Sequence, residues 1–218
     1  MAHERCGERE PEQGQSAATH AREATRWLLA AASAATLAAC GGDGSGPTIG
    51  TPRADLLALA RVDSAEPSPA TFVFKNNQLR TFLVTHSDST TTLFARLNFF
   101  PRSVVSRNDT LLCDSCTVTV TVAVTPGGYE LTIGPAGLVF NQTGEPVMTV
   151  TYDRYGDPSV YTSSPRYASA TEFIQALGLW HERALDRWVL GRNSTHLGPD
   201  SVTSALEGPG RFLLAAPK

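Results

Sequence analysis

The chain has 218 residues, of which 41% are hydrophobic and 18% charged, and its formal net charge at pH 7 is −3. This length accommodates one domain of ordinary size with short appendages. The chain carries no basic stripe and so lacks the electrostatic footprint of a nucleic-acid-binding protein, which excludes nucleic acid as an expected partner.

An uncharged apolar run of 13 residues covers positions 27–39, and Arg22 and Arg26 precede it. A membrane-spanning helix needs about 20 apolar residues, so this run is too short to span a bilayer. It has the length of the apolar region of a secretory signal, about 7–15 residues. The alternative interpretation is an apolar helix of a globular core that ends at a glycine cap.

The run ends in "LAAC" at residues 37–40, which resembles the lipobox of bacterial lipoproteins. The resemblance implies cleavage before Cys40 and acylation of its thiol. Acyl chains contribute about 0.8 kcal/mol per buried CH₂ and hold a protein on a membrane without a spanning helix. The residue directly after Cys40 is Gly41 and not Asp. In this the sequence resembles lipoproteins that are sorted to an outer membrane. The implied location is the cell envelope, with the chain lipid-anchored at the outer membrane.

Residues 1–26 carry five acidic and four basic residues, whereas a signal begins with a short positive segment. We therefore expect translation to start near Arg22. The expected organisation is a signal sequence at 1–39, a lipidated Cys40 with a flexible Gly/Ser-rich linker at 40–69, and a β-sandwich domain at 70–218.

Strand patterns fill the expected domain. Within the linker, "ADLLALARV" at 54–62 predicts a short helix or a first strand, and from Ala70 onward the apolar period is two. The clearest strand is "CTVTVTVAVT" at 116–125, whose valines face one way and whose threonines face the other. Such alternation is typical of an antiparallel sheet with one face on a core.

Several other segments are expected to be strands. They lie at 71–76, 78–86, 91–99, 129–135, 137–141 and 146–153, with a hairpin at 177–191 and a closing strand pair at 201–206 and 211–216. Many short strands at regular spacing predict an all-β, antiparallel, immunoglobulin-like β-sandwich.

The segments 97–105 and 118–153 are similar to the ZU5-like β-sandwich of bacterial surface lipoproteins. The shared pattern is a strand that ends in Phe-Pro, alternating Val and Thr, a "PxGLxF" corner, and then Pro-Val followed by a tyrosine. The matching residues are Pro135, Gly137, Leu138, Phe140, Pro146, Val147 and Tyr152, and Trp180 and Trp188 resemble the family's paired aromatic strands. The corner is expected to turn Leu138 and Phe140 into the core.

Some relatives cleave themselves at a His-Phe-Ser motif, but residues 207–212 contain neither His nor Ser, so self-cleavage is not expected.

Cys113 and Cys116 form a C-x-x-C motif, for which a disulfide, a redox pair and half of a metal site are the possible interpretations. A redox pair is expected at a helix N-terminus, whereas this one precedes a Val/Thr strand. A structural zinc site needs four ligands, and no second pair of His or Cys is spaced to supply them. A disulfide that holds the turn before the long strand is the favoured interpretation.

Motifs of known catalytic sites are absent. Leu185 stands where an H-E-x-x-H motif starting at His181 needs its second His, and neither a G-x-S-x-G nor a phosphate-binding glycine motif occurs. His86, close to Asp88, is expected in a polar turn. No metal and no cofactor are expected.

Tyr155, Tyr161 and Tyr167 fall in a segment rich in Tyr and Ser, the composition of adaptable binding loops. We consider them a candidate binding loop for a glycan. The alternative is a long connection whose tyrosines pack on the edge of the sandwich.

The favoured function is that of a membrane-anchored, non-enzymatic β-sandwich that binds an envelope protein or a glycan. An exported enzyme with a shallow site at the sandwich end, using the cysteine pair or the His86 region, is the alternative. A spacer subunit of an assembly is a third possibility.

Overall fold

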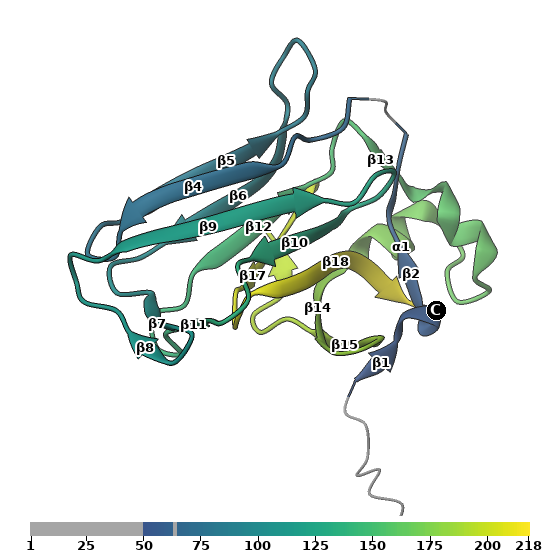
Figure 1. The fold of residues 1–218 in the computed structure, drawn as a ribbon. Coiled ribbons are helices and arrows are strands. Elements are labelled where there is room, and N and C mark those ends of the chain that lie inside the picture. Colours follow the sequence, from purple (N-terminus) through teal and green to yellow (C-terminus); the bar gives the residue numbers. More distant parts are fainter. Residues whose placement is uncertain (1–49, 63–64) are drawn as a thin grey trace, which may run out of the picture. The chain divides into compact units, whose positions relative to one another are not determined.

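The computed structural model describes residues 50–62 and 65–218, which all belong to one compact unit. The expected signal sequence, the start near Arg22 and the acylation of Cys40 therefore lie outside the described residues. About half of the residues lie in strands (49%), which form several antiparallel sheets (Figure 1), and this confirms the expected all-β, sandwich-like fold. Within it, no helix is both long enough and apolar enough to cross a bilayer.

The larger sheet has eight strands in the order β1, β15, β14, β18, β10, β9, β4, with β2 also paired to β18. Their bounds are Thr51–Pro52 (β1), Leu56–Ala58 (β2), Ala70–Lys75 (β4), Thr117–Val124 (β9), Glu130–Gly134 (β10), Gly178–Ala184 (β14), Arg187–Leu190 (β15) and Gly210–Pro217 (β18). Every pairing in this sheet is antiparallel.

The second sheet has five strands in the order β16, β17, β12, β6, β5. They span Arg80–Thr85 (β5), Leu93–Phe99 (β6), Val147–Thr151 (β12), Thr195–His196 (β16) and Ser201–Ala205 (β17). Smaller elements complete the fold: Ala60–Arg61 (β3), Val104–Arg107 (β7), Thr110–Leu111 (β8), Leu138–Phe140 (β11), Gly156–Asp157 (β13), the 3-10 helices Arg53–Asp55 (η1) and Pro158–Ser163 (η2), and the helix Ala170–Gln175 (α1).

The core lies between the two large sheets. Phe74 on β4 meets Phe99 on β6 with ring centroids 4.9 Å apart, and Phe94 on β6 stacks on Tyr129 at 5.5 Å. Phe94, Phe99 and Tyr129 are at most 1% exposed. Because burial of one such side chain contributes about 1.5–3 kcal/mol, these contacts hold the sheets face to face.

Strand β9 follows the predicted alternation. Val118, Val120 and Val122 are at most 2% exposed, whereas Thr117 and Thr121 on the other face are exposed. The period of two therefore identified the buried face correctly, and only the last valine of the strand, Val124, is half-buried.

The corner after β10 also behaves as predicted, since Leu138 and Phe140 enter the core and are 4% and 1% exposed. Gly137 has φ +83°, a conformation that glycine adopts without strain. A Cβ at this position would collide with the side chain of Asn108, so the corner requires glycine for two reasons.

The segment 177–191 forms the expected hairpin of β14 and β15, but the expected closing strand pair is wrong. Strand β17 pairs with β12 and β16, while β18 pairs with β2, β10 and β14 in the other sheet. The link between them contains Gly208 and Pro209 and carries the chain from one sheet to the other.

The strands begin before the expected domain boundary at residue 70. Residues 51–61, assigned by the sequence to a flexible linker, supply β1, β2 and β3, and Leu56 and Leu59 are each 1% exposed. For the segment 54–62 the strand alternative holds, after the single turn of η1. Apolar side chains, which a solvated tether does not need, bring this segment into the fold.

Candidate functional site

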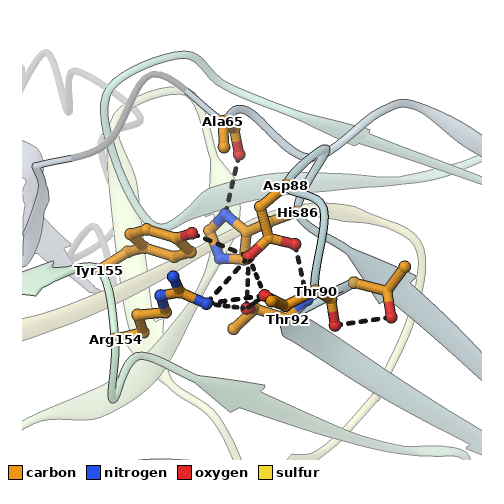
Figure 2. Close-up of polar contacts among 8 residues, drawn as sticks. Ala65, His86, Asp88, Thr90, Thr92, Arg154 and Tyr155 are labelled. Atoms are coloured by element: carbon orange, nitrogen blue, oxygen red, sulfur yellow. Dashed lines mark hydrogen bonds and ion pairs between the residues drawn. The ribbon is translucent and has the colours of Figure 1, made fainter.

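Two loops meet at one end of the smaller sheet. One follows β5 and contains Asp88, Thr90 and Thr92, and the other follows β12 and contains Arg154 and Tyr155 (Figure 2). The first loop tops the β5–β6 hairpin, and the second leads into β13. We call the polar contacts among these five residues the Asp88 cluster.

The carboxylate of Asp88 is the centre of the Asp88 cluster. Its Oδ2 accepts hydrogen bonds from the hydroxyls of Tyr155 (2.8 Å) and Thr90 (2.9 Å), and its Oδ1 accepts one from the backbone N–H of Thr92 (2.9 Å). Arg154 Nη1 lies 3.5 Å from Oδ2 and also donates to the hydroxyl of Thr90 at 2.7 Å. Only 9% of the Asp88 side chain is exposed. A carboxylate with this many donors is held in one place.

These contacts determine the charge of the cluster. The hydroxyl of Thr92 above all, with the donors from Tyr155 and Thr90, holds the pKa of Asp88 well below its usual range. The hydrogen bond between Tyr155 and Asp88 also raises the pKa of Tyr155, because the Tyr155 hydroxyl donates to the carboxylate. Asp88 is thus ionised at physiological pH and binds protein donors, which suits an anchor of loops better than a general acid.

His86 lies directly behind the cluster and is 3% exposed. Its Nδ1 is 3.0 Å from the carbonyl oxygen of Ala65, so Nδ1 carries the proton in that contact. Its ring lies 4.4 Å from the ring of Tyr155 and 5.5 Å from that of Phe94. The histidine thereby joins the loop to the core.

A cavity of about 230 Å³ opens beside the cluster. The residues that line it include the aromatic residues His86, Tyr129, Tyr152 and Tyr155 and the charged residues Asp153 and Arg154; we call it the Tyr155 cavity. The side chain of Arg154 is 53% exposed. Tyr152 donates to the carbonyl of Pro199 at 3.0 Å, and burial, with the charge of Asp200, raises its pKa to about 12. The cavity therefore combines aromatic walls with an accessible cation and a carboxylate.

The structure does not bring the three candidate tyrosines together. Only Tyr155 lines the cavity, while Tyr161 in η2 packs against the core. Tyr167 is 8% exposed, donates to the carbonyl of Pro217 and meets Phe173 edge-on. Tyr161 and Tyr167 thus follow the alternative interpretation, that of tyrosines packed on the sandwich.

Cys113 and Cys116 lie within disulfide distance, with their Cα atoms 5.0 Å apart. They occupy the turn between β8 and β9, and Figure 1 shows this turn and the β5–β6 hairpin at well-separated places in the fold. The cysteine pair therefore belongs to a different region from the Tyr155 cavity. No metal-binding group of three or more His, Cys, Asp or Glu residues occurs in the part of the chain that the structure describes.

Sequence reasoning missed Arg154 and Tyr152 as site residues. The available signal was "YDRY" at 152–155, which places two tyrosines and two opposite charges directly after a strand.

A second, larger cavity of about 510 Å³ lies at the other end of β12, where Arg192 pairs with Glu145 beside the exposed Phe100. One aromatic residue lines this second cavity, whereas four line the Tyr155 cavity.

Comparison of the chain with protein-family models, with curated proteins and with solved structures gives no match in any of the three.

Proposed function

We propose that the protein is a lipid-anchored β-sandwich of the bacterial cell envelope that binds a glycan in the Tyr155 cavity and does not turn it over. The observation that carries the proposal is the cavity itself, a space of about 230 Å³ lined by four aromatic residues together with Asp153 and the exposed Arg154. Drug-sized ligands occupy about 300–1,000 Å³, so this space suits a single sugar ring or a group of similar size.

Sugar chemistry fits these walls. The C–H face of a sugar ring is apolar and packs against aromatic side chains, which combine large contact area with little conformational entropy. Arg154 offers guanidinium donors, and Asp153 offers carboxylate acceptors, to the hydroxyls around the ring. A neutral or acidic sugar unit of an envelope polysaccharide is the ligand class that uses both kinds of group.

The lipobox supports the location. Ten residues, 41–50, separate Cys40 from the first strand. A Gly/Ser-rich chain of ten residues has a root-mean-square reach of about 18 Å as a random coil, so acylation at Cys40 would keep the body close to the lipid surface. In Figure 1, β1 and the β5–β6 hairpin lie on opposite sides of the fold, so the strand that follows the linker is far from the loops of the Tyr155 cavity.

Binding is tested with the full chain, extracted in detergent from membranes of a producing cell. Immobilised protein is incubated with soluble peptidoglycan fragments and, separately, with envelope oligosaccharides, and the retained sugar is quantified by mass spectrometry. Tyr155→Ala should lose retention at least tenfold. Tyr161→Ala, a tyrosine outside the cavity, is the matched control and should retain sugar like the wild type.

Two results would contradict the proposal. Equal retention by wild type and Tyr155→Ala would remove the cavity as the binding site. Turnover of the retained glycan by the wild type, lost in His86→Ala, would favour the alternative of an exported enzyme.

A further inference from the structure

Strand β4 forms one end of the larger sheet. It pairs with β9, and no strand within residues 50–62 or 65–218 pairs with its other edge. Strand β5 ends the smaller sheet beside it, since Phe72 on β4 stacks on Phe82 on β5 with ring centroids 4.5 Å apart. Both sheets therefore end on the same side of the sandwich, in the region where Figure 1 shows β4 and β5.

The backbone direction along β4 follows from one hydrogen bond. The N–H of Asn76 donates to the carbonyl of Cys116 at 3.0 Å, on the β9 side. In an antiparallel ladder the N–H and C=O of a residue point the same way, and this direction alternates along the strand. Phe72 and Phe74 therefore direct their backbone groups toward β9, while Thr71, Val73 and Lys75 direct theirs to the open edge.

Strand β4 contains no proline, no bulge and no inward-pointing charge, three of the features that prevent edge-to-edge pairing, and a fourth, an edge lysine, occurs only at its last residue. The register of β4 against β9 is regular over all six residues, and Lys75 is the only charged one. Val73 is 61% exposed, on the outer face at the middle of the strand. By contrast, β5 carries a register shift between Val84 and Thr85.

We propose that β4 pairs antiparallel with β4 of a second copy of this chain, in a register centred on Val73. A twofold axis at Val73 places Val73 against its symmetry mate, Phe72 against Phe74 of the second copy, and Thr71 against Lys75 of the second copy. The larger sheet then continues from one copy into the next, with its inner face kept inside. Three hydrogen-bonded residue pairs provide about six backbone hydrogen bonds.

This register brings no like charges opposite one another. Each Lys75 faces a threonine, and the two lysines lie about 13 Å apart along the strands, so no like charges oppose one another. The aromatic rings at the open edge also gain cross-strand partners, because Phe72 and Phe74 stand on the same face. A strand that satisfies both its backbone and its side chains against itself makes an isologous dimer contact.

The test is thiol cross-linking of the full chain in membranes, with a bis-maleimide that has a two-carbon spacer. Val73→Cys places two thiols on the proposed axis, where opposite Cβ atoms are about 5 Å apart, and should yield mainly covalent dimer. Leu83→Cys is the control, because Leu83 on β5 is similarly exposed at 53% but lies off the axis. Wild-type protein shows the background from Cys113 and Cys116.

The register is tested by charge at Thr71 in the Val73→Cys background. Thr71→Lys opposes Lys75 of the second copy and should reduce the dimer band about two- to fivefold, while Thr71→Glu should raise it. Both changes are on an exposed edge, and circular dichroism confirms that each variant folds. Equal cross-linking at Leu83, an adduct with a different protein, or the same effect from Thr71→Lys and Thr71→Glu would each overturn the proposal.

Discussion

Tyr155 donates a hydrogen bond of 2.8 Å to the carboxylate of Asp88 across 67 positions of the chain. This bond joins the tip of the β5–β6 hairpin to the segment after β12, and both segments line the Tyr155 cavity. The shape of the cavity thus depends on contacts between two loops.

Removal of the Tyr155 hydroxyl should loosen the hairpin tip. In Tyr155→Phe the ring stays against His86 while Asp88 loses one of its donors, so the loop at 87–92 should exchange its amide hydrogens faster. Hydrogen–deuterium exchange of the two proteins measures this directly. Tyr161→Phe removes a hydroxyl elsewhere and should leave that loop unchanged; faster exchange in both variants would contradict the assignment.

Asp88 should make stability depend on pH at the acidic end. Its folded pKa is depressed, so its contribution is fully present above the unfolded value of about 3.9 and is lost as pH falls toward the folded value. Asp88→Asn should therefore be clearly less stable than the wild type at pH 7, with the gap shrinking below about pH 4. Urea unfolding at pH 7 and pH 3 tests this, and a gap that stays constant would contradict it.

Gly127, in the turn between β9 and β10, is a matched control for Gly137 at the corner after β10. Both have positive φ, +83° and +75°, but only at Gly137 would a Cβ meet the side chain of Asn108. Gly127→Ala should cost about 1–2 kcal/mol of unfolding free energy from backbone strain alone, and Gly137→Ala should cost clearly more. Chemical denaturation of both variants gives the comparison; equal losses would show that Asn108 moves aside freely.

Cys113 and Cys116 should be oxidised in protein from the native compartment. The bond closes a loop of four residues, for which loop entropy gives about 2 kcal/mol at most, so the reduced protein should still fold. Mass spectrometry after alkylation detects free thiols, and denaturation with and without reductant gives the energy. Free thiols in freshly isolated protein would favour the redox alternative.

Cys40→Ala should move the protein from the membrane fraction to the soluble fraction, since the proposed acyl chains are its anchor. Mass spectrometry of the wild type should find a diacylated or triacylated N-terminal Cys40. An unmodified thiol on the mature chain would contradict the envelope location.

Much of the strand content was predictable from local pattern. Strand β9 shows its buried face because Val118, Val120 and Val122 alternate with threonines, and β5 and β6 lie where the apolar period is two. The helix α1 was not predicted, although Ser169 and Glu172 are spaced as a capping box, in which Ser169 accepts from the N–H of Glu172.

Pairing partners were harder to predict. Strand β18 is buried on both faces over Phe212 to Ala216, so its side chains carry no period that would indicate a partner. The site was harder still, because Asp88 and Tyr155 become neighbours only when the sandwich closes. Composition located Tyr155, but it could not separate this residue from Tyr167, whose hydroxyl is bound to the last strand.

The pairing of the first strands has a mechanical consequence. Thr51 on β1 pairs with Trp188, and Leu57 on β2 pairs with Ala216 close to the end of the chain. Tension applied from the segment before Thr51 would have to peel β1 from β15 before any load reached β2 and the final strand. The two residues of β1 would therefore detach first under tension, while the strands that enclose the hydrophobic core stay paired.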